Sequence, residues 1–151
     1  MKKYFYNVYS NVKNKVFKKK EVFNLPPNIK LKLLKNIPTF YFVDFENVHR
    51  LNLQFIKNED IKIFIFLGMN QNSIDFSLVK KLQRFGENIH YIKMSHHGKN
   101  SLDFHLTYTM GEQNILVDKN IQFVIVSKDT GFDNLVRYIS KIRRCRRINS
   151  L

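Results

Sequence analysis

Hydrophobic and polar positions follow two patterns that take turns along residues 38–148. Short runs rich in β-branched and aromatic residues are followed by stretches in which apolar residues recur every three or four positions. Continuous apolar runs are typical of strands covered on both faces, whereas the longer period is typical of helices. The predicted strands are 39–43, 61–67, 89–93, 121–126 and a short last strand near 144–148.

Helices are predicted between these strands. The periodic stretches are 73–85, 102–116, 132–142 and a further one across 47–57. We expect Ser73 and Ser101 to be N-caps, because a Ser hydroxyl accepts a hydrogen bond from a free backbone N–H of the first turn. Alternating strands and helices predict an α/β fold with a central parallel sheet of four to five strands and helices on both faces.

The first 36 residues differ in character from the rest of the chain. They carry ten Lys against one acid, Glu21, and are interrupted by Pro26-Pro27. We expect a basic, partly ordered N-terminal extension over 1–36, with a helix around 28–36. The remaining 37–151 have the length of one domain.

Charge narrows the classes of partner. The net charge is +14 at pH 7, and the excess lies at the two ends of the chain, since 137–151 holds six basic residues and no acid. A charge of this size attracts polyanions, so nucleic acid is the leading partner and a solvated Lys-rich tail is the alternative.

Cys145 is the single cysteine, which excludes an internal disulfide or a cysteine-based zinc site and fits a reducing compartment. No apolar stretch approaches the roughly 20 residues that span a bilayer. We therefore expect an intracellular, cytoplasmic protein without a membrane partner, and organelle targeting stays open. A homodimer or an inhibitory protein partner is compatible with the sequence.

Carboxylates fall where three of the predicted strands end. Asp44 follows the first strand, Asp129 lies three residues after the fourth, and Asp103 opens the helix after the third. The carboxyl ends of parallel strands share one edge of a sheet, where ligands bind. Crowded carboxylates repel one another unless a cation compensates, and Mg²⁺ or Mn²⁺ takes oxygen ligands and activates water. The pattern predicts a divalent-cation site that cleaves phosphodiesters, although each acid alone could be a helix cap.

Three segments resemble the motifs of PIN-like nucleases of the NYN branch. Val43-Asp44-Phe45-Glu46-Asn47-Val48 is similar to the first motif, an Asp-x-x-Asn after strand one. Residues 98–105 resemble the middle motif, in which a basic loop precedes an Asp on a helix. Residues 126–135 resemble the third motif, Ser-x-Asp-x-x-Phe with a following acid. The resemblance covers roughly 38–148 and implies a three-layer PIN-like (Rossmannoid) fold and an endoribonuclease that uses Mg²⁺ or Mn²⁺.

The resemblance also implies roles for individual residues. It places the metal-binding acids at Asp44, Asp103 and Asp129. Asp133 would be a fourth acid and Asn47 would orient a ligand or the scissile phosphate.

Several further residues near these acids are candidates for capping, supporting or substrate-binding roles. Asp75, at the beginning of the 73–85 helix, is interpreted as a cap of that helix and left out of the core site, and Glu46 is a candidate for an outer-shell acid. Substrate contacts are expected from side chains near the acids or in the terminal basic cluster. These are Lys99, Lys128, Asn70, Ser127, Arg143 and Arg144. Ser127 would also steady the metal shell. The His96-His97 pair is more typical of a phosphate-contacting or solvated loop than of a zinc site.

Other functions fit part of the same pattern. A catalytically inactive PIN-like RNA-binding module would keep the fold and bind metal weakly or not at all. A DNA or structure-specific nuclease would use the same acids, and physics alone does not separate RNA from DNA. A phosphatase on a similar sheet is disfavoured because its Asp-x-Asp motif is replaced by Asp44-Phe45-Glu46.

Overall fold

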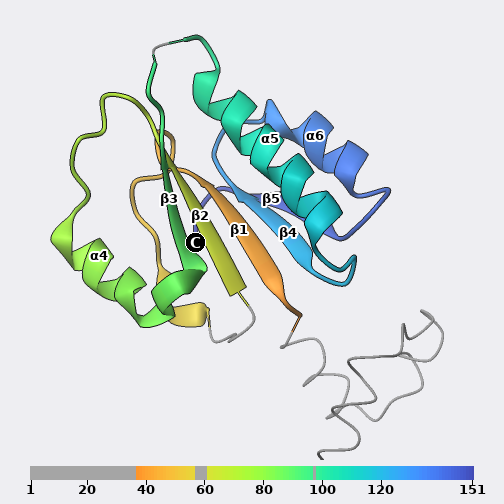
Figure 1. Ribbon diagram of the computed structural model, residues 1–151, viewed down its shortest axis with the longest axis horizontal. Helices are drawn as coiled ribbons and strands as arrows, with labels where there is room; N and C mark the ends of the chain where they lie inside the picture. The colour runs from red at the N-terminus through yellow and green to blue at the C-terminus, as the bar shows by residue number, and fades with distance from the viewer. Residues whose placement is uncertain (1–36, 57–60, 97) are drawn as a thin grey trace, which may run out of the picture. The chain divides into compact units, whose positions relative to one another are not determined.

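Five parallel strands form the central sheet, in the order β3-β2-β1-β4-β5 (Figure 1). Their bounds are β1 Thr39–Asp44, β2 Ile61–Leu67, β3 Ile89–Lys93, β4 Gln122–Val126 and β5 Cys145–Ile148. The computed structural model describes residues 37–56, 61–96 and 98–151. The expected extension over 1–36, with its helix around 28–36, lies outside the described residues. All five predicted strands are confirmed, each within a residue or two of the predicted bounds.

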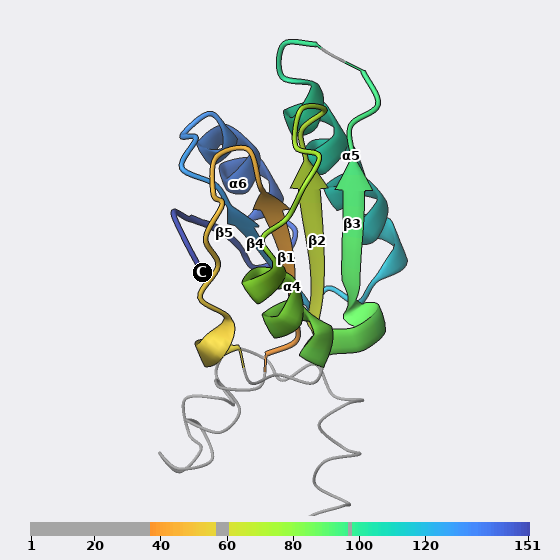
Figure 2. The ribbon, with the colours of Figure 1, turned by 90° about the vertical axis from the view of Figure 1, so that its left-hand side faces the viewer.

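Helices cover both faces of this sheet (Figures 1 and 2). One face carries α5 (Ser101–Leu116) and α6 (Phe132–Ile139). The other carries α4 (Phe76–Leu82) and the 3₁₀ segments η1 (Leu53–Phe55) and η2 (Gln83–Asn88). The predicted three-layer α/β architecture is therefore confirmed.

The alternation along β1 divides the core into two halves. Phe40 and Phe42 pack under α5 and α6, while Val43 packs on the opposite face with the side chains from α4. The α5 face is aromatic: the Phe42 ring stacks on Phe64 at 5.1 Å and meets the edge of Phe123 at 5.0 Å. Asp44 follows Phe42 by two residues, so its side chain points to this same face.

The chain changes direction across the sheet at β1. From β1 it runs outward through β2 to β3, and then returns to place β4 and β5 on the other side. This change makes the carboxyl ends of β1 and β4 the switch point at which open α/β sheets bind ligands.

The predicted helix across 47–57 is wrong. The chain leaves β1 in a turn and then runs extended to η1, burying Val48, Leu51, Leu53 and Ile56 against the sheet. These spacings fit a helix face and a docked extended segment about equally well. Asn52 favours the second arrangement, because its N–H donates to the Leu151 carbonyl oxygen at 2.6 Å and its side chain caps η1.

The helix ends also differ from the prediction. Asp75, rather than Ser73, is the N-cap of α4, and its carboxylate accepts from the Leu78 N–H at 3.1 Å. Ser101 is the first residue of α5, and Asn100 precedes it in a left-handed conformation at φ 61°. In the described part of the chain no helix is long and apolar enough to cross a membrane.

Candidate active site at the carboxyl ends of the strands

Asp44 is the last residue of β1 and is almost fully buried, with 1% of its surface exposed. Its Oδ2 accepts from the Ser127 hydroxyl at 2.7 Å and from the Asn47 side-chain amide at 2.6 Å. Its Oδ1 accepts from the Asn47 backbone N–H at 3.2 Å. A buried carboxylate is costly without such partners, so Asn47 and Ser127 fix both the position and the orientation of Asp44.

Ser127 links two of the predicted acids. It follows β4 by one residue, and the pairing of Val43 with Val126 places it directly beside Asp44. While its hydroxyl donates to Asp44, the same oxygen accepts from the Asp129 N–H at 3.0 Å. The Asp129 carboxylate in turn accepts from the Gly131 N–H at 2.7 Å. A single buried hydroxyl thus joins the end of β1 to the loop that carries Asp129.

Asp103 lies in the first turn of α5 and is half-buried. Burial raises the pKa of Asp103, and the negative charges of Asp44, Asp129 and Glu46 raise it further. Three other carboxylates thus lie near enough for their charges to act on Asp103, while the roles of these acids as metal ligands stay predictions. The crowding opposes the ionised form of Asp103 and favours any cation that enters.

Glu46 reaches the same site, although sequence reasoning gave it only an outer-shell role. Its side chain lies against Gly68, where an added Cβ would come within 1.9 Å of Glu46 Oε1. Asp44 pairs with Phe66, so two residues further on Glu46 comes beside Gly68. The two-residue step from Asp44 is the signal in the sequence that places Glu46 near the site, whereas the register with β2 that brings it beside Gly68 is seen only in the fold.

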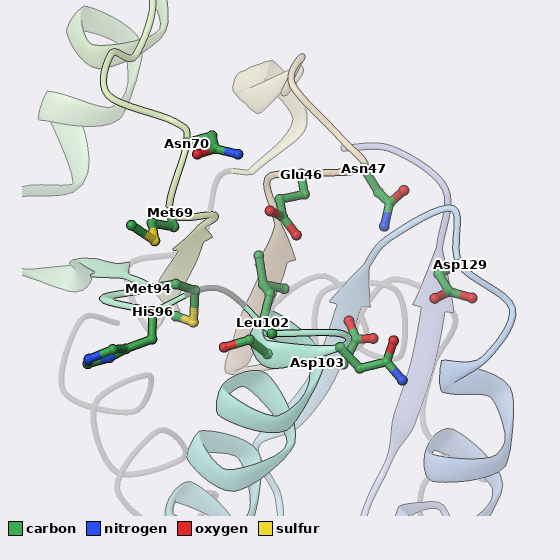
Figure 3. A pocket seen from close by; sticks show the side chains of 12 residues that line it. Glu46, Asn47, Met69, Asn70, Met94, His96, Leu102, Asp103 and Asp129 are labelled. Atoms are coloured by element: carbon green, nitrogen blue, oxygen red, sulfur yellow. The ribbon is translucent and has the colours of Figure 1, made fainter.

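Three of these acids, Glu46, Asp103 and Asp129, border a pocket of about 270 Å³ (Figure 3), whereas the buried Asp44 is not part of its lining. Glu46 and Asn47 reach it from the loop after β1, Asp103 from the start of α5 and Asp129 from the loop after β4. The remaining lining residues come from the ends of β2 and β3 and from the first residues of α5. They are Met69, Asn70, Met94, His96, Gly98, Asn100, Ser101 and Leu102. The pocket is thus built from four strand ends.

A family model described as PIN domain matches residues 38–148. The chain belongs to the PIN-domain family. The match runs from the residue before β1 to the end of β5 and includes all four acids of the site. No curated protein and no solved structure matches the chain. PIN domains are usually nucleases and generally use divalent metals, whereas membership of the NYN branch stays a prediction.

The donor set of this PIN domain fits a hard divalent cation. Within 37–56, 61–96 and 98–151, no three His, Cys, Asp or Glu side chains converge closely enough to hold an ion directly. The chemistry of the pocket is nevertheless that of Mg²⁺ or Mn²⁺, because its acids offer only oxygen. Burial and then the neighbouring negative charges raise the pKa of Asp103, and a cation would offset those charges. Mg²⁺ usually keeps several waters and binds through one or two carboxylates, so full convergence of side chains is not required.

Of the residues predicted to contact substrate, some line the pocket of the PIN domain and others lie on the surface outside it. Asn70 lines the pocket. Lys99 and Lys128 are exposed in the loops that also carry lining residues, and Arg144 is exposed just before β5. His96 lines the pocket as well, while His97 lies outside the described residues. The roles of these side chains stay predictions.

Asp133 is engaged elsewhere. It lies in the first turn of α6, and the pocket lining does not include it. Its Oδ1 accepts from Arg147 Nε at 2.7 Å in an ion pair. This hydrogen bond and the positive charges of Arg147 and Arg137 lower the pKa of Asp133. The structure thus gives Asp133 a cationic partner that the sequence did not reveal.

Arg143 is buried, with 4% of its surface exposed, and is not available to RNA in this position. All five of its N–H groups donate to oxygens around the C-terminal end of α5. The acceptors are Asn114 Oδ1 and the carbonyl oxygens of Asn114, Val117, Asp118 and Ile121. Its guanidinium also lies 4.1 Å from the centroid of the Phe123 ring. The expected substrate contact is therefore replaced by a structural cap on α5.

Proposed function

We propose that this PIN domain is a metal-dependent endoribonuclease that hydrolyses RNA phosphodiester bonds with Mg²⁺ or Mn²⁺. One observation carries the proposal: Asp103 shares an open pocket with Glu46 and Asp129, and the nearby buried Asp44 adds a third negative charge that acts on it. Acids concentrated at one edge of a chain of net charge +14 fit a site that draws a polyanion to a cation.

Asp44, Asp103 and Asp129 would hold the ion, with waters completing its shell. When bound, the ion supplies an activated water and stabilises charge on the phosphoryl group. Asn47 and Ser127 orient Asp44 through hydrogen bonds of 2.6 and 2.7 Å. Glu46, exposed over the pocket, can accept a proton at its carboxylate from a water near the phosphate.

Substrate affinity would come from the cations around this acidic centre. Lys99 and Lys128 flank lining residues and can contact phosphates on either side of the scissile bond. Arg144 is exposed and can add non-specific contacts, and Asn70 offers an amide inside the pocket. We expect this binding to weaken with salt. The choice of RNA over DNA rests on the resemblance to the NYN branch.

The test is cleavage of a labelled single-stranded RNA, and of DNA with the same sequence, in Mg²⁺, Mn²⁺ or EDTA. We expect metal-dependent cleavage of RNA that is lost in Asp103→Asn. Glu112→Gln is the matched control, since it removes one negative charge from the exposed side of the same helix.

Each other outcome points to a different function. Cleavage that survives both EDTA and Asp103→Asn would refute the metal mechanism. Cleavage of DNA alone would indicate a DNA nuclease. RNA binding without cleavage under any metal would indicate an inactive RNA-binding module.

A further inference from the structure

Arg147 lies on β5 with 15% of its side chain exposed, beside the loop that carries Asp129. Its Nε donates to Asp133 Oδ1 at 2.7 Å, and its Nη2 lies 3.4 Å from Asp133 Oδ2. Its Nη1 donates to the Ser127 carbonyl oxygen at 2.9 Å and to Asn149 Oδ1 at 2.7 Å. One guanidinium therefore binds the residue just after β5, the residue just after β4 and the first turn of α6.

These contacts hold both ends of one short loop. Ser127 begins the loop between β4 and α6, and Asp133 lies just past its end. Asp129 lies between them, with its N–H on the Ser127 hydroxyl and its carboxylate on the Gly131 N–H. A planar guanidinium that binds in two directions restricts a loop more strongly than a single ammonium could.

We propose that Arg147 is a positioning residue for the metal site, holding the Ser127–Asp133 loop so that Asp129 faces the other acids. Asp133 is then the partner of Arg147 and not a fourth metal ligand. The assignment rests on the proposed function for its metal, and on the hydrogen bonds of Arg147 for its geometry.

Arg147 lies near enough to the pocket for its positive charge to act on Asp129. Its hydrogen bond to Asp133 and the negative charges of Asp133 and Asp129 raise the pKa of Arg147. Arg147 therefore interacts with a pocket acid while it makes no hydrogen bond to it among the described contacts. Its charge offsets part of the repulsion among the carboxylates.

Two effects of removing Arg147 have opposite signs. Loss of a positive charge beside a cation site, by itself, strengthens the binding of a divalent ion. Loss of a positioning contact weakens it, and changes in residues that orient ligands typically cost 10–100-fold in metal affinity. The sign of the change in Mn²⁺ affinity for Arg147→Met thus separates positioning from simple charge.

The first experiment measures Mn²⁺ affinity by electron paramagnetic resonance of the free ion. We expect Arg147→Met and Asp133→Asn to weaken binding by about tenfold or more, and Arg147→Lys to weaken it less. Arg146→Met is the matched control: it removes the same charge from the neighbouring, exposed position of β5, and should not weaken binding. Unchanged or tighter Mn²⁺ binding in Arg147→Met would overturn the proposal. If Asp133→Asn weakened Mn²⁺ binding and Arg147→Met did not, Asp133 would instead be a metal ligand.

The second experiment needs neither metal nor activity. Amide hydrogen exchange of the metal-free protein, followed by NMR, should be faster at Asp129 and Gly131 in both Arg147→Met and Arg147→Lys. Exchange at Ile65, in the middle of β2, should stay slow and shows that each variant is folded. Unchanged protection at Asp129 and Gly131 would overturn the positioning role. A wild-type protein that neither binds Mn²⁺ nor cuts RNA would refute the proposed function, while this exchange result still decides the role of Arg147.

Discussion

Replacing the buried Arg143 by Met should destabilise the fold without a specific effect on RNA binding. The side chain supplies five hydrogen bonds of 2.8 to 3.2 Å to oxygens at and beyond the end of α5. Met has a similar length but no donors. Four of these acceptors are backbone carbonyls that no later turn of α5 can satisfy. The Lys119 ammonium and the Ile121 N–H still donate to the carbonyls of Asn114 and Asp118, so the cost of losing Arg143 falls mainly on the carbonyls of Val117 and Ile121.

The magnitude follows from the number and the burial of the acceptors. A buried acceptor left without a partner costs about 1–3 kcal/mol. Residues around the end of α5 are only partly buried, so water replaces some of the lost donors. We expect the free energy of unfolding to fall by about 3–4 kcal/mol, which corresponds to a fall in Tm of roughly 10 °C.

Urea unfolding followed by far-ultraviolet circular dichroism measures this change. Arg144→Met is the control: it removes the same charge from an exposed neighbour and should change stability by no more than about 0.5 kcal/mol. A loss below about 1 kcal/mol in Arg143→Met, together with weakened RNA binding, would refute the reasoning and restore Arg143 as a substrate contact.

Three further predictions concern the site itself. Burial and neighbouring carboxylates raise the pKa of Asp103 above 3.8, so the folded protein loses stability as pH rises from 3.8 through the raised value. In EDTA, Asp103→Asn should therefore increase Tm at neutral pH and have no effect below pH 3.8, and a thermal series without the neutral-pH gain would contradict this. Gly68→Ala should displace Glu46 from the pocket and lower the cleavage rate with little loss of stability. Gly111→Ala is its control and should leave the rate unchanged, because the added Cβ meets no side chain and no part of another element within 4 Å. Ser127→Ala should cost about 1–3 kcal/mol in urea unfolding and slow cleavage, and wild-type values for both would argue against a link through its hydroxyl.

Strands and strand-end acids were predictable because local sequence encodes them. Runs such as 61–67 are apolar, β-branched and bounded by polar residues, so they have few alternatives to a buried strand. Asp44, Asp103 and Asp129 each occur at the end of a strand or the beginning of a helix. The position of an acid at a shared edge therefore follows from the order of the elements alone.

The residue roles that the sequence did not reveal depend on contacts between residues far apart in the chain. Arg143, Arg144 and Arg147 belong to one basic cluster and look alike in sequence. In the fold Arg143 is a buried cap on α5, Arg147 binds Asp133 across 14 positions, and Arg144 faces solvent. Glu46 depended on the register that brings it beside Gly68. These differences arise from pairing and packing, which no local pattern records.

The most direct test of the carboxylate-bound cation is the rate of RNA cleavage as a function of Mg²⁺ concentration. Wild-type protein should show a rate that saturates with Mg²⁺ and falls to background in EDTA. Asp103→Asn should cut at least about 100-fold more slowly at every Mg²⁺ concentration, although its fold is intact and its thermal stability at neutral pH is higher. A variant that cuts at the wild-type rate, or a wild-type rate independent of Mg²⁺, would contradict a site in which Asp44, Asp103 and Asp129 hold the catalytic ion.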